Sequence, residues 1–290
     1  MINTVSIFHL VLSFTLFTFN IYNPYFGLFL GLISPLFLLF YFDLSSKLKI
    51  ELIVALIIYG LMFKTFLVYY LLAVLIPVIF IIYLKDKSEF TAGLPSLLIS
   101  SLVLLFFQDI REAFISNMSQ NLLSYLEMIK SSATVDKLLY LDKIKNNIDK
   151  IATTFIYIMP GLSFAYITFI TYLNKRFYQK IKKEPVKPLI VPFKIIPVFV
   201  IGGFLILANS YTAKIISYNT FIIFFMFFFL QGIEIIEYWL KKLKFPILLK
   251  YIVYFFVILE PPITLIVSFI GLFDIWIDFR KINKKGGENG

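Results

Sequence analysis

The sequence contains no cysteine and a single histidine, His9, in 290 residues. Without cysteine the chain can form no disulfide, no thiol nucleophile and no cysteine-ligated metal site, and one histidine excludes a multi-histidine metal centre. Charged residues are also scarce, at 15% of the chain, whereas soluble domains carry about a quarter. We therefore expect no metal or other cofactor, and we do not expect a soluble domain.

Sequence motifs of enzymes are missing as well. The chain has no Gly-x-Ser-x-Gly nucleophile turn, no glycine-rich loop of the kind that binds phosphate and no His-Glu-x-x-His zinc motif. No pair of carboxylates stands at a spacing that suggests catalysis. The prediction is that the protein is not an enzyme.

What the chain does contain is apolar sequence. Hydrophobic residues make up 60% of it, and its mean hydropathy is +0.90. The net charge of +10 could suggest nucleic acid, but the basic residues cluster in short loops between apolar runs. That is the pattern of loops on the cytoplasmic side of a membrane. We predict a multi-pass protein of the cytoplasmic (inner) membrane that contacts the lipid bilayer and binds no nucleic acid.

The apolar runs predict an all-α fold, a polytopic transmembrane helix bundle of about eight to nine spans. The first run, within 4–19, lacks the features of a cleaved signal peptide and is expected to be a retained helix. Nine runs can be counted, at about 4–19, 25–42, 50–63, 66–84, 92–107, 151–173, 195–207, 220–240 and 251–279. With the N-terminus inside, the loops at 43–49, 85–91, 174–194 and 241–250 are cytoplasmic. A ninth crossing would leave the C-terminal lysines outside, so either the last run is a hairpin or an earlier run does not cross.

The chain is predicted to have four parts: N-terminal membrane helices at 1–110, a polar insert at 111–150, C-terminal membrane helices at 151–281 and a disordered tail at 282–290. Apolar residues in the insert recur at spacings of three and four, which predicts two amphipathic helices hinged near Ser131-Ser132. We expect the insert to be extracytoplasmic. It could rest on the bilayer surface or form a lid over the bundle.

The loop at 174–194 is the most basic part of the chain, with seven lysines and arginines against one acid, Glu184. Its three prolines, Pro185, Pro188 and Pro192, should prevent it from continuing as a helix. Anionic lipid would suit this loop, and so would a membrane or cytoplasmic protein partner.

The last apolar run holds the candidate functional centre. Glu260 lies within it, followed by Pro261 and Pro262, which should break the helix. A carboxylate facing lipid at this depth costs on the order of 2.5–3.5 kcal/mol, so Glu260 is expected to face the protein interior, with Gln231 as a candidate partner. The break should also free backbone carbonyls near Val257 and Ile258 that could bind a cation or an ammonium group.

Two further groups of polar residues accompany this centre. Gln231 and Glu234 lie on one face of the run at 220–240 and are candidates for a polar interior that binds a ligand, together with Glu260. The C-terminal motif of Asp274, Asp278 and Arg280 is predicted to lie at the membrane interface.

The segment Gln231-Gly232-Ile233-Glu234-Ile235-Ile236-Glu237-Tyr238-Trp239-Leu240-Lys241 and the closing Gly271-x-x-Asp274-x-x-x-Asp278-Phe279-Arg280-Lys281 resemble the YybS-like family of bacterial membrane proteins, also called the domain of unknown function 2232. Tyr172-Leu173-Asn174-x-Arg176 before the basic loop is similar as well. The resemblance covers nearly the whole chain. It implies a fold distantly similar to the S-components of energy-coupling-factor transporters, although more than six apparent spans and the insert at 111–150 depart from that pattern.

Two functions remain open at this stage. The first is small-molecule binding or transport, with S-component-like capture of a substrate near the broken last helix. The alternative is a non-transporting membrane scaffold that recruits protein partners in the cell envelope through the basic loop and the insert.

Overall fold

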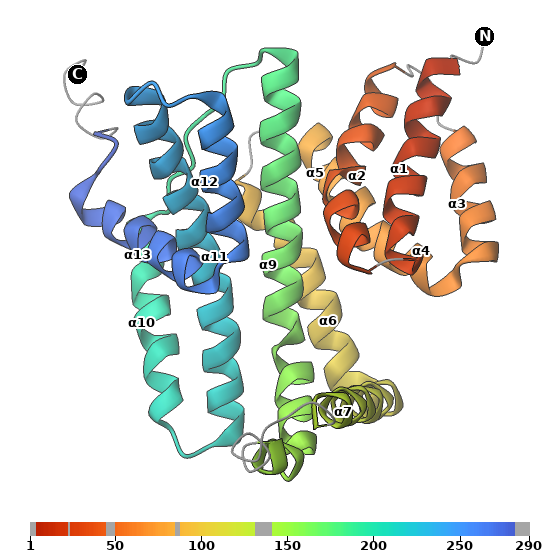
Figure 1. Cartoon of the computed structure of the whole chain (residues 1–290), viewed down its shortest axis with the longest axis vertical. Helices are drawn as coiled ribbons and strands as arrows, with labels where there is room; N and C mark the ends of the chain where they lie inside the picture. The colour runs from red at the N-terminus through yellow and green to blue at the C-terminus, as the bar shows by residue number, and fades with distance from the viewer. Residues whose placement is uncertain (1–3, 23, 45–49, 85–87, 131–140, 282–290) are drawn as a thin grey trace. The chain divides into compact units, whose positions relative to one another are not determined.

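The computed structural model describes residues 4–22, 24–44, 50–84, 88–130 and 141–281 (Figure 1). These residues form helices and turns, and none of them lies in a β-strand. The chain divides into two compact units. One consists of Met1–Leu94, Ala165–Phe193 and Phe225–Gly290, and the other of Pro95–Phe164 and Lys194–Phe224.

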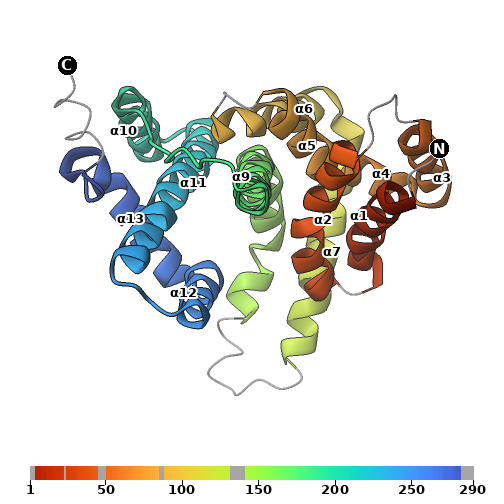
Figure 2. The same cartoon turned by 90° about the horizontal axis from the view of Figure 1, so that it is seen from above.

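The first unit consists of a series of N-terminal helices and of all or part of four later helices. In chain order its elements are α1 (Thr4–Tyr22), α2 (Pro24–Leu44), α3 (Ile50–Met62), α4 (Lys64–Tyr70), a π-helical turn (Leu71–Leu75), α5 (Ile76–Tyr83), a 3₁₀ turn (Glu89–Gly93), the later part of α9 (Ile148–Lys182), the later part of α11 (Tyr211–Lys242), α12 (Ile247–Leu259) and α13 (Pro261–Ile277). Helices α1 and α2 lie side by side, as Figure 2 shows from above.

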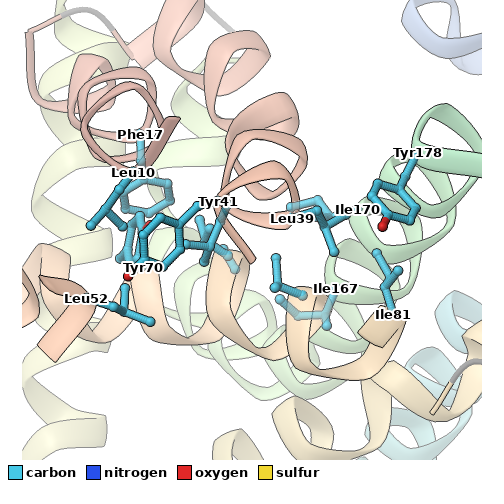
Figure 3. Packing of buried hydrophobic residues seen from close by; sticks show 14 of the residues in the cluster. Leu10, Phe17, Leu39, Tyr41, Leu52, Tyr70, Ile81, Ile167, Ile170 and Tyr178 are labelled. Carbon is cyan, nitrogen blue, oxygen red and sulfur yellow. The ribbon is translucent and has the colours of Figure 1, made fainter. Parts of the chain in front are cut away.

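The core of this unit is built from α1 to α5 and α9 (Figure 3). Tyr70 is fully buried there and stacks on Phe14, with ring centroids 4.2 Å apart. Its hydroxyl lies 2.9 Å from Ser13 Oγ, and Ser13 and Ser34 each donate a hydrogen bond to the other's backbone carbonyl. Small hydroxylated side chains of this kind let helices approach closely and link them where no water is available.

Proline positions follow the helix boundaries and irregularities. Pro24 begins α2, and Pro77 lies in the first turn of α5, directly after the π-helical turn. Proline has no N–H to donate and its ring crowds the preceding turn, so a locally widened helix accommodates it. The run at 66–84, predicted as one segment, is therefore continuous but irregular.

The second unit contains α6 (Leu94–Phe106), α7 (Gln108–Lys130), a short helical stretch at 141–145, the first part of α9, α10 (Ile196–Phe204) and the first part of α11. Leu126 of α7 packs with Leu141 and Ile148, and Leu122 and Ile129 join the same cluster. Part of each apolar stripe predicted for the insert therefore packs against the other, while Phe114 and Ile144 are exposed. The predicted hinge at Ser131-Ser132 lies outside the described residues, and the extracytoplasmic location of the insert stays a prediction.

A side chain of α11 enters the hydrogen-bonding pattern of α9 in this unit. Asn219 Oδ1 accepts a hydrogen bond from the Gly161 N–H at 2.7 Å, and its Nδ2 donates to the Tyr157 carbonyl at 3.0 Å. Those are the donor and the acceptor that an uninterrupted α-helix would join to each other. At Pro160-Gly161, therefore, the amide of Asn219 on α11 takes the place of one backbone hydrogen bond of α9.

All nine predicted apolar runs are helical over most of their described length, but the span count is not settled. Four helices are long and apolar enough to cross a bilayer, Phe66–Tyr83, Glu89–Phe106, Ile148–Lys182 and Tyr211–Lys242. The bent pair α12 and α13 would make a fifth. The remaining four runs contain shorter apolar helical stretches of 10–17 residues, at Thr4–Phe19, Leu30–Leu44, Ile50–Met62 and Phe193–Leu207, below the about 20 residues of a simple crossing. The prediction of eight to nine spans is therefore supported only as a bundle with four or five candidate spans.

The predicted break in the last run is confirmed. Helix α12 ends at Leu259, α13 begins at Pro261, and the two axes differ by 99°. The break falls here because prolines fit the first turn of a helix, whose N–H groups have no partner in any case. Pro261 and Pro262 therefore end one helix and begin the next.

The predicted start of the basic loop is wrong. Helix α9 continues through Asn174 and ends only at Lys182, because lysines and arginines in this stretch are good helix formers. Residues 183–192, which contain the three prolines, are non-helical as predicted. We call this segment, residues 183–192, the strap.

A buried charged cluster and its cavity

Glu234 of α11 is the centre of a cluster of charged side chains in the first unit. Its carboxylate forms ion pairs with Arg176 of α9 and, at 3.5 Å, with Arg280, which follows α13. The Tyr172 hydroxyl donates to it at 3.1 Å and the Leu189 N–H at 3.2 Å. Two cations and two neutral donors therefore share one carboxylate, which offsets the cost of removing it from water.

Gln231, one helical turn earlier on α11, joins the strap to α13. It is 1% exposed, its Oε1 accepts from the Val191 N–H at 2.6 Å, and its Nε2 donates to Asp274 Oδ2 at 3.0 Å. Asp274 Oδ2 also accepts a hydrogen bond from Arg280 Nη2, at 2.9 Å. The amide of Gln231 thus holds the strap at one end and α13 at the other.

Arg280 reaches this position because the chain reverses at the end of α13. Asp278 adopts a left-handed conformation with φ 49° and ψ 61°, which ends the helix. The Phe279 N–H then donates to Asp274 Oδ1 at 2.7 Å. Asp274 therefore has two structural roles, since it holds the turn through one oxygen and binds Arg280 through the other.

A close crossing of α11 and α13 brings these groups together (Figure 1). A Cβ atom on Gly232 would lie 2.1 Å from the Val267 carbonyl oxygen, and one on Gly271 would lie 1.9 Å from the Phe228 carbonyl oxygen. Only glycine permits such backbone contact. Each glycine stands near a polar residue of the cluster, so the crossing sets the distance between Gln231 and Asp274.

The strap is extended, and its backbone is bound by side chains of the cluster. Arg176 Nη1 donates to the Lys187 carbonyl at 2.8 Å and Arg280 Nη2 to the Leu189 carbonyl at 3.0 Å. Leu189 and Val191 are 5% and 2% exposed, whereas Ile190 between them is 47% exposed. Burial that alternates in this way is typical of an extended chain, whose successive side chains lie on opposite sides of the backbone.

A cavity of about 140 Å³ lies between the strap and the end of α13. It is lined by Ile190, Val191, Pro192, Phe193, Gln231, Asp274, Ile275, Asp278 and Arg280. Arg280 is only 6% exposed, and within the described part of the chain its buried Nε–H has no hydrogen-bond partner. The described residues contain no group of three or more acidic or histidine side chains that could hold a metal ion.

The predicted site residues are only partly brought together. Gln231 and Glu234 lie in the same cluster, but Glu260 is exposed between α12 and α13 and does not line the cavity. The expectation that it faces the interior beside Gln231 is wrong, because the 99° bend directs the chain away at that point. The carbonyl of Val257, expected to be free for a cation, accepts the Thr264 hydroxyl at 2.8 Å.

Asp274 and Arg280 are buried within the protein, at 5% and 6% exposure. Their position at the membrane interface stays a prediction. Arg176 and Tyr172 were not predicted as part of a site, although both belong to the motif before the basic loop. The sequence does contain a signal for this contact: an arginine and a tyrosine at the end of one apolar run, and an acidic residue, Glu234, inside a later one.

An all-helical chain with four or five helices able to cross a bilayer and a charged cluster sheltered among them is an integral membrane protein. The family model described as a predicted membrane protein, DUF2232, matches residues 11–275. The chain therefore belongs to this family. No curated protein and no solved structure shows a significant match to it.

Proposed function

We propose that this membrane protein binds a small molecule in the cavity between the strap and α13. One observation carries the proposal: Arg280 lines the cavity, is 6% exposed, and has an Nε–H that no described residue accepts. A buried donor without a partner costs about 1–3 kcal/mol. A ligand that supplies an acceptor would remove this cost.

The composition of the cavity wall supports the same function. Ile190, Phe193 and Ile275 provide apolar surface, and a few polar groups stand among them. Ligand sites in proteins are mostly apolar, with a small number of polar groups that fix orientation. Gln231 and Glu234, both candidates from the sequence, keep their place in the proposal: Gln231 lines the cavity, and Glu234 positions Arg280.

The strap provides a route for exchange. Its inward face is bound to the cluster by hydrogen bonds from side chains, and it forms one wall of the cavity. Opening the strap would expose the cavity without moving a helix. Capture of a substrate in the manner of an S-component is the fuller form of this proposal, and transport would require an energy source that the sequence does not identify.

The test fills the cavity without touching the charged cluster. Ile190→Trp adds bulk at a cavity-lining position on the strap, and Val186→Trp adds the same bulk at a strap position that is equally exposed, at 47%, and does not line the cavity. Native mass spectrometry of the purified protein is expected to show a retained small molecule in the wild type and in Val186→Trp. The ligand should be lost in Ile190→Trp, and that variant should still unfold cooperatively.

Equal retention by Ile190→Trp would place the ligand elsewhere. If the wild type retains nothing and no fragment mixture raises its melting temperature, the binding proposal fails.

A second candidate is the membrane scaffold, favoured by the exposure of the lysine side chains of the strap. Lys183 and Lys187 are both exposed, and they would suit an acidic protein segment. A photo-crosslinker at Val186 in cells distinguishes the two: a single protein adduct at stoichiometric yield supports the scaffold, and lipid adducts alone oppose it.

A further inference from the structure

We infer that the ligand of this cavity is an uncharged molecule about the size of a six-membered ring, bound through a carbonyl or a similar hydrogen-bond acceptor. The inference rests on the proposed function and names the chemical class that the site would take. It follows from three properties of the wall: which hydrogen-bonding atoms are already used, what charge the wall carries, and how much space it encloses.

The side-chain acceptors of Asp274 and Gln231, the two most deeply buried acceptor residues of the wall, are occupied. Asp274 Oδ1 binds the Phe279 N–H at 2.7 Å, and Oδ2 binds Gln231 Nε2 at 3.0 Å and Arg280 Nη2 at 2.9 Å. Gln231 Oε1 binds the Val191 N–H at 2.6 Å. A ligand that offers only donors would find these atoms already in use.

The donors of the wall are not all occupied. Arg280 Nε–H has no acceptor among the described residues. The amide nitrogen of Gln231 carries two hydrogens, and the one hydrogen bond it donates within the described structure goes to Asp274. The wall therefore requires a ligand that brings acceptors, and a carbonyl oxygen with two lone pairs meets that requirement.

The charge on the wall disfavours an anion. One guanidinium, that of Arg280, is accompanied by two carboxylates, those of Asp274 and Asp278. Arg280 is already paired with Asp274 at 2.9 Å and lies 3.5 Å from Glu234. A carboxylate ligand would add a third negative charge to the wall, at a buried position where such repulsion is weakly screened. A neutral acceptor keeps the hydrogen bonds and avoids the repulsion.

The volume limits the ligand to a small ring. The cavity measures about 140 Å³, close to the roughly 150 Å³ that holds benzene in a well-studied engineered cavity of another protein. Ile190, Phe193 and Ile275 present apolar surface to such a ring. A six-membered ring with one acceptor group therefore matches the space and the chemistry together.

Three probes of nearly equal shape separate the possibilities: benzamide, benzoate and benzylamine. Binding is measured by calorimetry or ligand-observed NMR on the full chain in lipid nanodiscs, with Ile190→Trp and Val186→Trp as the filled and control variants. We expect wild type and Val186→Trp to bind benzamide at least about 10-fold more tightly than either charged probe. Ile190→Trp should bind none of them.

The outcomes distinguish the inference from the function on which it rests. If benzoate or benzylamine binds as well as benzamide and Ile190→Trp abolishes that binding, the cavity is a ligand site but the inferred class is wrong. If no probe binds the wild type and no fragment mixture stabilises it, the Nε–H is only hydrated and both proposals fail.

Arg280→Lys provides a second check, because it keeps the positive charge and removes the Nε–H. It should lose benzamide binding at least 10-fold relative to the wild type. If this variant does not fold, the comparison of Ile190→Trp with Val186→Trp decides the result alone.

Discussion

Gly271 of α13 lies against the backbone of Phe228 on α11, so that a Cβ at position 271 would stand 1.9 Å from the Phe228 carbonyl oxygen. The same methyl would lie 2.8 Å from the Gly232 nitrogen. Backbone atoms cannot move aside as a flexible side chain can. The two helices must therefore separate if either glycine gains a side chain, and the cluster beside them depends on this contact.

Gly271→Ala is accordingly expected to lower the free energy of unfolding by about 3 kcal/mol, the upper part of the range for overpacking a core. Gly203→Ala is the control, because a Cβ there would lie an ordinary 3.5 Å from Phe221 Cζ. Denaturation in detergent, followed by tryptophan fluorescence, measures both. If the two variants are equally stable, the close crossing of α11 and α13 is not present in the protein.

Asn219→Leu should destabilise the second unit. The substitution keeps the shape of the side chain and removes its bonds to the Gly161 N–H and the Tyr157 carbonyl. A loss of about 1–2 kcal/mol is expected, measured as a shift of the unfolding transition. Thr220→Val is the neighbouring control, since that hydroxyl bonds only to the Ile216 carbonyl of its own helix within the described structure. Equal effects of the two substitutions would contradict the bridging role of Asn219.

The sequence predicts the helices of this protein well, because each apolar run identifies itself by local composition. The position of the break at Pro261 follows in the same way, since the effect of proline on a helix is local. Hydropathy cannot decide which of the shorter runs cross the bilayer. That depends on tilt and on neighbouring helices.

The candidate site was predicted less well, for a physical reason. Arg280 meets Glu234 only because Asp278 reverses the chain and because Gly271 and Gly232 allow α13 to approach α11. Each of those features is visible in the sequence on its own. Together they bring Arg280 close to Glu234, 46 positions earlier in the chain, and the sequence does not show that approach. The prediction for Glu260 fails because it rests on local sequence alone. Its position inside an apolar run predicts burial, whereas the chain bends at that residue and leaves it exposed.

Tyr70→Phe tests the cluster of buried hydroxyls, those of Ser13, Ser34 and Tyr70, that links α1, α2 and α4. It removes the 2.9 Å contact with Ser13 Oγ and leaves the ring stacked on Phe14. Interhelical hydrogen bonds in membrane proteins average about 0.6 kcal/mol, so a fall in unfolding free energy of about that size is expected. Tyr83→Phe is the control because Tyr83 is 71% exposed. A cost above about 2 kcal/mol would show that the hydroxyl has a further partner.

The predicted membrane topology can be tested with single cysteines, since the sequence contains none. Val186 on the strap and Asn121 on α7 are both exposed. The distribution of lysine and arginine predicts that Asn121→Cys is labelled in intact cells by an impermeant maleimide and that Val186→Cys is labelled only after lysis. Labelling of Val186→Cys in intact cells would reverse the predicted orientation.

Glu234→Gln separates the buried cluster from ordinary surface ion pairs. The substitution removes the negative charge shared by Arg176 and Arg280, whose side chains are 14% and 4% exposed, and leaves both with less compensation in a sheltered position. Removing one partner of a buried ion pair costs about 3–5 kcal/mol. The strap should also loosen, because Glu234 holds the Leu189 N–H and helps to position both arginines that bind its backbone.

We therefore expect Glu234→Gln to lower the free energy of unfolding by about 3 kcal/mol. Trypsin should also cut the variant faster after Lys183. Glu237→Gln is the matched control on the same helix: its partner Lys241 is 68% exposed, and an exposed pair of this kind contributes about 0.5 kcal/mol or less. Unfolding curves and a timed digestion measure the two effects independently. If Glu234→Gln loses stability while digestion of the strap is unchanged, the cluster holds the helices together but does not hold the strap, and exchange of a ligand through the strap is then unsupported.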